Sequence, residues 1–176
     1  IPKLRDFDSI YADYSRMVYW AAYNVTGNRD SAMDVSQEVF MRVLKHMNRL
    51  ENMEDMQLKG WLYRVAVNAG VDMVRRNKRE VFFDEPPFDS AVEAESELPE
   101  QAAINAEKTG ALYKAIGGLD EIYREPIMLH YFSGLNYKEI ASMLGVTEGT
   151  IKSRMSRART MLQATLKEGG AVDGVE

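Results

Sequence analysis

The stretch "NYKEIASMLGVTEGTIKSRMSRARTMLQ", residues 136–163, is the most informative part of this chain. Its apolar residues recur at helical spacing on both sides of Gly145, and Thr147 stands where a helix N-cap is expected. The glycine permits a tight turn between two helices, and Val146 fills the space beside it. This order of helix, turn and second helix predicts a helix-turn-helix, a unit that many proteins use to bind DNA.

The second helix of this unit has two unlike sides. At about 100° per residue, one narrow stripe is apolar: Ile151, Met155, Ala158 and Leu162. The opposite side carries small, polar and basic groups that suit base edges, with Lys152 and Arg157 among them, while Arg154 and Arg159 lie at its edges and suit phosphates. The predicted DNA-binding residues are Thr150, Lys152, Ser153, Arg154, Ser156, Arg157 and Arg159. The alternative is a basic face that is only solvated.

The basic helix contrasts with the formal net charge of the chain, which is −5. The acidity is local, because residues 81–106 contain seven acidic residues and no Lys or Arg. Three of the five prolines also fall in this segment, which shows no sustained helical period. These features predict an extended linker. It is either a plain tether or a mimic of nucleic acid that occupies a positively charged channel.

Helical patterns lie on both sides of this linker, and no long alternating run indicates a strand. The sequence therefore predicts an all-α protein with two small helical domains, residues 1–80 and 107–168, joined by linker 81–106 and followed by a flexible tail, 169–176. The expected helices are 7–26, 30–48, 58–77, 101–117, 120–132, 137–144 and the helix that follows Thr147. Gly27 should end the first helix, and Asp30 or Ser31 should cap the second.

Composition excludes several kinds of site. The chain has no cysteine and two histidines that are far apart in sequence, so we expect no disulfide, no metal site and no cofactor. It has no Gly-rich phosphate loop and no cluster of carboxylates, which argues against an enzyme that acts on nucleic acid. No apolar run approaches the roughly 20 residues of a membrane span, so we expect a cytoplasmic protein.

The predicted helix 58–77 has one polar face and one apolar face. Trp61 shares the polar face with arginines and Asn68, and the opposite face carries Leu62, Ala66, Ala69 and Met73. An aromatic ring beside cations can stack on an unpaired base while the cations hold the strand. The alternative is that Trp61 packs under the preceding loop.

The predicted second helix turns Val35, Val39, Phe40, Val43 and Leu44 inward. Its outward residues include Asp34, Gln37, Glu38 and Met41. An exposed methionine in a patch of mixed charge is either harmless or part of an interface.

These segments together resemble a known family. "LDEIYREPIMLHYFSGLNYKEIASMLGVTEGTIKSRMSRARTMLQ", residues 119–163, resembles region 4 of the extracytoplasmic-function (ECF) sigma factors, which are bacterial promoter-recognition subunits of the sigma-70 family. "DSAMDVSQEVFMRVLKH", residues 30–46, resembles their polymerase-binding helix in region 2. "LKGWLYRVAVNAGVDMVRR", residues 58–76, resembles the helix that reads and melts the −10 element. The resemblance covers both domains in the order of the family.

The resemblance implies a protein that brings core RNA polymerase to promoters, with the −35 element read by the second domain and the −10 element by the first. The −10 residues it implies are Trp61, Arg64, Asn68, Arg75 and Arg76, and the loop 48–57 corresponds to the segment that receives a flipped base. The implied contacts with the β′ clamp helices of the polymerase are Asp34, Gln37, Glu38 and Met41. Further implied partners are the β flap, promoter DNA and an anti-sigma factor, commonly tethered to the membrane.

One alternative remains open at this point. A helix-turn-helix regulator of the response-regulator output type would bind DNA without being a polymerase subunit. It would account for the second half of the chain only.

Overall fold

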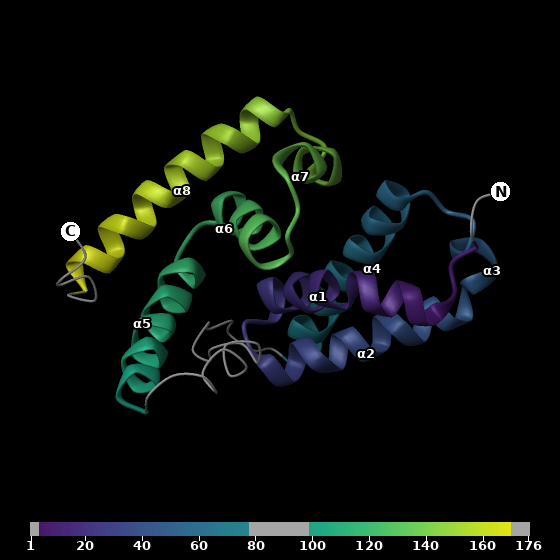
Figure 1. Ribbon diagram of the computed structural model, residues 1–176, viewed down its shortest axis with the longest axis horizontal. Helices are drawn as coiled ribbons and strands as arrows, with labels where there is room; N and C mark the ends of the chain where they lie inside the picture. The colour runs from purple at the N-terminus through teal and green to yellow at the C-terminus, as the bar shows by residue number, and fades with distance from the viewer. Residues whose placement is uncertain (1–3, 78–98, 170–176) are drawn as a thin grey trace.

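The computed structural model describes residues 4–77 and 99–169, and within these ranges the regular elements are helices, without a strand, as the predicted all-α class requires. The first group comprises α1 (Phe7–Thr26), α2 (Arg29–Lys45), α3 (Met47–Leu50) and α4 (Asp55–Asn77). The second comprises α5 (Pro99–Gly117), α6 (Glu121–Ile127), the π-helix η3 (Met128–Phe132), α7 (Tyr137–Leu144) and α8 (Glu148–Glu168). Figure 1 shows the two groups side by side, with α6 and α7 next to α1 and α4.

Helix α1 is the centre of the first domain and packs against both α2 and α4. Gly70 of α4 allows a close approach to α1, because a Cβ at this position would lie 3.2 Å from the Cβ of Val25. Helix α1 ends at Gly27, as predicted, and this glycine has the left-handed φ of 73° that a residue with a side chain rarely adopts. The first domain is therefore a bundle in which α1 contacts the other two long helices.

Three details of the first domain differ from the prediction. Asn28 caps α2 by accepting a hydrogen bond from Ser31 N at 2.8 Å, so Asp30 and Ser31 lie inside the first turn and are not the cap. Helix α2 ends at Lys45, and α3 adds one helical turn within the loop that we expected to be irregular. Leu44 is 57% exposed and does not point inward, because none of the described helices covers that side of α2.

The helix-turn-helix of the second domain has the predicted form. Thr147 caps α8 by accepting a hydrogen bond from Thr150 N at 3.1 Å, and Gly145 has a φ of 69°. The apolar stripe is buried at Ile151, Met155 and Ala158. The predicted cap and turn are confirmed, and Leu162, the last residue of the predicted stripe, is half-buried.

The segments before the motif differ from the expectation. The expected helix 120–132 consists of α6 followed by the wider turn of η3, in which Ser133 N donates to Met128 O at 3.2 Å. Helix α5 begins at Pro99, two residues before the expected helix 101–117, and it includes residues 99–106, which we also counted as part of the linker. The remainder of the predicted linker, with the carboxylates of the nucleic-acid-mimic hypothesis, and the tail from residue 170 lie outside the described residues.

Candidate nucleic-acid interface

The outward face of α8 has the composition that the sequence predicts. Lys152, Ser153, Ser156 and Arg157 are all exposed, while the apolar stripe on the other side of the helix is buried. The face adjoins a surface hollow of about 440 Å³ whose wall includes Gly149, Ser153 and Arg157. Small side chains at the start of the helix leave room for a base edge, and the long basic ones can reach past them. The geometry suits insertion of α8 into a major groove.

Arg159 is held at one edge of this face by two tyrosines. Its Nη1 donates to the hydroxyls of Tyr131 and Tyr137, each at 3.1 Å, and both rings meet His130 edge-on at 4.9 Å. The hydrogen bonds to Tyr137 and Tyr131 hold the pKa of Arg159 above its usual value. Because hydroxyls do not neutralise the guanidinium, the charge remains available for a phosphate.

Arg154 lies at the other edge and is half-buried. It is near Glu125 of α6: burial raises the pKa of that carboxyl, while the charge of Arg154 opposes the rise. Arg154 therefore has a carboxyl group close by, whereas Arg159 is held by neutral groups.

Thr150 is half-buried, and its hydroxyl shares a hydrogen bond of 2.9 Å with the hydroxyl of Thr147. Thr150 and Arg154, two of the predicted DNA-binding residues, therefore contribute to the fold of the motif.

Helix α4 exposes the second predicted face. Arg64, Asn68, Arg75 and Arg76 are exposed, opposite the buried side chains of Leu62, Ala66 and Ala69. Trp61 is half-buried, and its ring meets that of His46, between α2 and α3, edge-on at 6.1 Å. Arg64 and Asn68 line a pocket of about 300 Å³ whose other wall is formed by Ser142 and Met143 of α7. The polar face of α4 therefore borders the second domain.

The outward residues of α2 border an apolar groove between α1 and α2. Asp34, Gln37 and Met41 are exposed, and Met41 has 70% of its surface accessible. Glu38 accepts a hydrogen bond of 2.9 Å from Arg42 one turn later. The groove has a volume of about 640 Å³, and its lining includes Tyr11, Gln37, Phe40, Met41 and Leu44. An apolar groove with a polar rim has the composition of a protein-docking surface.

Comparison with known proteins gives these surfaces a family context. The family model for sigma-70 region 2 matches residues 10–80, and the one for sigma-70 region 4 matches residues 109–162. The ECF RNA polymerase sigma factor SigM of Bacillus subtilis is 33% identical over 163 residues, which cover 92% of this chain and 96% of that protein. The chain belongs to the ECF sigma factors.

A second ECF sigma factor that is similar to this chain is SigE of Mycolicibacterium smegmatis. It is 34% identical over 157 residues, which cover 89% of this chain and 60% of SigE. The match to region 2 followed by region 4 excludes the alternative of a plain helix-turn-helix regulator, which would leave the first domain unexplained.

Two solved structures resemble the fold of this sigma factor. The sigma factor RpoE of Bartonella quintana, solved in complex with the anti-sigma factor NepR, aligns with a TM-score of 0.64 and 26% identity over 92% of this chain and 97% of RpoE. CnrH in complex with the cytosolic domain of CnrY aligns with a TM-score of 0.59 over 92% of this chain and 88% of CnrH, and at 23% identity this likeness concerns the fold alone. No helix in the described ranges has the length and apolar content to cross a bilayer.

Sequence reasoning missed three features of this sigma factor. These are the two tyrosines that hold Arg159, the apolar groove beside α2, and the contact between the domains. The sequence did contain a signal for the tyrosines, because "HYF" at 130–132 and Tyr137 place four aromatic or imidazole rings around the start of the motif. The groove depends on how α1 packs against α2, and the domain contact depends on how helices distant in sequence pack. Periodicity reports neither kind of packing.

Proposed function

We propose that this ECF sigma factor binds core RNA polymerase and directs it to promoters. Residues 1–80 bind the polymerase and the −10 element, residues 107–168 bind the −35 element, and the segment between them connects the two. The observation that carries the proposal is that α4 and α8 of one chain each expose a polar, arginine-bearing face opposite a buried apolar stripe.

The −35 element is read by α8. Lys152, Ser153, Ser156 and Arg157 face base edges in the major groove, and Arg159 binds a phosphate at the margin of the site. The Thr150 hydroxyl is engaged with the Thr147 cap, and Arg154 has the Glu125 carboxyl close by, so both contribute less to the reading of bases. Specificity then depends mainly on the exposed side of the first half of α8.

The −10 element is bound by α4 once the duplex is open. Arg64, Arg75 and Arg76 hold the strand, and Asn68 makes a direct hydrogen bond to it. Trp61 packs against the core beside His46 and supports the start of α4. Each domain alone binds DNA weakly because each is small, and the polymerase-bound pair gains affinity through avidity.

The polymerase binds the rim and groove of α2. Gln37 and Met41 lie both in the predicted patch and in the groove wall, and Asp34 and Glu38 supply charge beside them. The partner surface that we propose is the β′ clamp helices, since an amphipathic helix fits an apolar groove. The second domain faces the β flap.

An anti-sigma factor is the inhibitor that we propose for this chain, tethered at the membrane as is common in the family. The sigma factor itself acts in the cytoplasm and catalyses no reaction of its own. It changes where the polymerase starts, by binding.

Transcription in vitro with purified core polymerase tests this function. We expect promoter-specific transcripts that depend on this protein, and Glu38→Lys should reduce them by weakening core binding. Asp13→Lys makes the same change of charge sign at an exposed α1 position outside the groove, and should leave transcription unchanged. DNA binding without any stimulation of core polymerase would overturn the proposal.

A further inference from the structure

We propose that Met41, on the outward side of α2, is a site of reversible oxidation to methionine sulfoxide by a peroxide, and that the sulfoxide weakens binding of core polymerase. This inference rests on the proposed function, since it concerns the groove that we assign to the polymerase. It is carried by the exposure of the Met41 thioether, by a sequence without cysteine and by the apolar lining of the groove.

The thioether of Met41 is the most accessible one in the chain. All eleven methionines lie in the described ranges. Three of them are exposed: Met41 at 70%, Met33 at 43% and Met161 at 39%. The others are buried or half-buried, so an oxidant dissolved in water meets their sulfur atoms less often. Such an oxidant should therefore modify Met41 first.

No thiol competes with this thioether, because the chain contains no cysteine. Cysteine thiolates react with peroxides, and redox-sensing proteins commonly use them. Without a thiolate, methionine sulfur is the most readily oxidised group that this chain offers. Sensitivity to a peroxide is then concentrated where methionine is exposed.

The oxidation transfers one oxygen atom to Met41. A lone pair of Sδ attacks one oxygen of hydrogen peroxide, the O–O bond breaks, and the second oxygen leaves as water after a proton transfer. Sulfur is oxidised by two electrons and the peroxide is reduced by two. A methionine sulfoxide reductase reverses the change, because its two thiols supply two electrons, form a disulfide and release the oxygen as water.

The groove beside Met41 is a poor place for a polar group. Its lining includes Tyr11 and Phe40, whose rings meet edge-on at 4.9 Å. Ser36 also lines the groove, but its hydroxyl already donates to Ala32 O at 2.8 Å. A sulfoxide is hydrogen-bonded to water in the free chain and would lose those bonds when a partner covers the groove.

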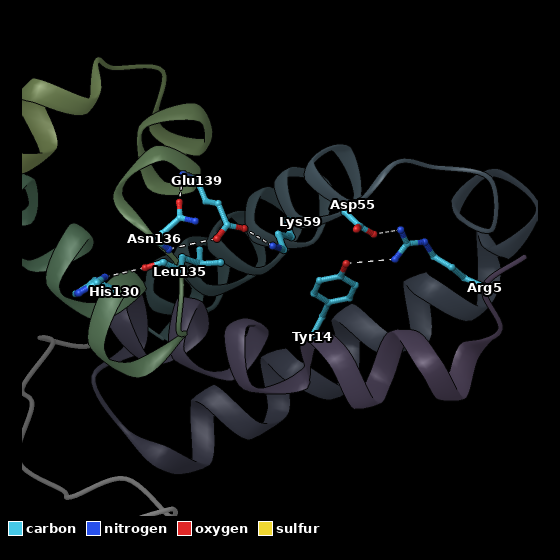
Figure 2. A network of polar contacts seen from close by, with 8 residues as sticks. All are labelled: Arg5, Tyr14, Asp55, Lys59, His130, Leu135, Asn136 and Glu139. Atoms are coloured by element: carbon cyan, nitrogen blue, oxygen red, sulfur yellow. Dashed lines mark hydrogen bonds and ion pairs between the residues drawn. The ribbon is translucent and has the colours of Figure 1, made fainter. Parts of the chain in front are cut away.

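The groove has this form before a partner binds. Helices α1 and α2 pack side by side (Figure 1). Helix α1 is also held to α4, because Arg5 donates to Tyr14 Oη at 3.2 Å and forms an ion pair with Asp55, as Figure 2 shows. Met41 is therefore open to a dissolved oxidant in the free chain, and the polymerase covers it in the holoenzyme.

The DNA-binding face of α8 does not share this sensitivity. Met155 is buried, and Met161 lies in the wall of a separate hollow between α5 and α8. The side chains that we assign to the −35 element contain no sulfur: Lys152, Ser153, Ser156, Arg157 and Arg159. Oxidation should therefore weaken core binding and leave duplex binding by α8 unchanged.

Oxidation of the free sigma factor before core polymerase is added tests the inference. Hydrogen peroxide is applied and removed, the methionines are mapped by mass spectrometry, and core affinity is measured by fluorescence anisotropy. We expect sulfoxide at Met41 before the other methionines. Core affinity should fall about ten-fold, as for one polar group buried without its hydrogen bonds. The two methionine sulfoxide reductases, one for each sulfoxide epimer, should together restore it.

Three variants separate Met41 from the other methionines, each compared with itself before treatment. Met41→Leu has an apolar side chain without sulfur and should lose no core affinity on treatment. Met161→Leu makes the same change in the hollow between α5 and α8 and should lose as much as the wild type. Met41→Gln carries a polar group of similar length and should bind core more weakly without any oxidant.

An equal loss of affinity on treatment in Met41→Leu and the wild type would overturn the inference. Complete oxidation of Met41 with unchanged core affinity would do the same. The holoenzyme should protect Met41 from peroxide, and equally fast oxidation in the free and bound states would also contradict it. A failure of the proposed function is distinguishable, because it appears in the untreated protein as the absence of core-dependent transcription.

Discussion

The outward faces of α4 and α8 differ in how much they depend on the rest of the molecule. The face of α8 is exposed, and its orientation follows from a local cap, a local turn and a stripe buried in its own domain. The face of α4 borders α7 of the other domain. One DNA-binding surface is therefore ready in the free chain, and the other depends on where the second domain lies.

The largest loss of DNA-binding free energy on substitution is expected on the face of α8. Lys152→Ala and Arg157→Ala should each weaken binding of the −35 element by roughly 1–3 kcal/mol if the side chain reads a base edge. Binding of single-stranded DNA by α4 should not change. Electrophoretic mobility shifts with specific duplexes, scrambled duplexes and a single strand measure both quantities. Equal loss on all duplexes would mean that these residues contact phosphates instead.

A smaller effect is expected for Asn68 on α4. Asn68→Ala should weaken single-strand binding by about 1 kcal/mol, the net value of one hydrogen bond. Fluorescence anisotropy with a labelled single strand measures this loss. An unchanged affinity in Asn68→Ala would show that Asn68 does not contact the strand.

Arg159 should affect all DNA sequences alike. Arg159→Ala should lower the affinity for specific and scrambled duplexes equally, and should reduce the salt dependence by about one phosphate contact. Tyr137→Phe keeps the ring but removes one hydroxyl that holds the guanidinium, so its effect should have the same character and be smaller. Measuring the DNA affinity of each variant at several salt concentrations distinguishes the effect of Arg159→Ala from the smaller effect of Tyr137→Phe. Loss of sequence preference in Arg159→Ala would instead place this side chain on a base.

The smallest effect is expected at Glu125, which bears on stability alone. Burial raises the pKa of this carboxyl, so the folded state prefers the protonated form, and stability is lost as the pH rises from the unfolded pKa through the folded one. Glu125→Gln should therefore raise the unfolding midpoint at pH 7. It should give no gain at pH 4, where the acid is largely neutral already. Thermal melts at the two pH values check this, and an equal gain at both would exclude the electrostatic cause.

The contrast between the faces also explains what the sequence could predict. The cap at Thr147, the turn at Gly145 and the buried stripe of α8 are local features, and all three are confirmed.

The cap of α2 was predicted two or three residues late, because Asp30 and Ser31 are as good cap formers as Asn28. Leu44 was assigned to the core because helical periodicity does not show which side of α2 the described helices leave uncovered. The contacts of Arg16 and Trp20 with η3 join residues more than 100 positions apart, which local patterns do not report.

The buried side chains of both domains form one continuous cluster that runs through Trp20. Residues that share a core tend to lose their order together when a protein is heated. In a calorimeter, the isolated sigma factor should therefore melt as one cooperative unit, with the enthalpy of the whole chain in a single peak. Loss of the contact should divide that peak into two smaller transitions, one for each domain. The melting profile thus reports the arrangement of the domains without any label attached to the chain.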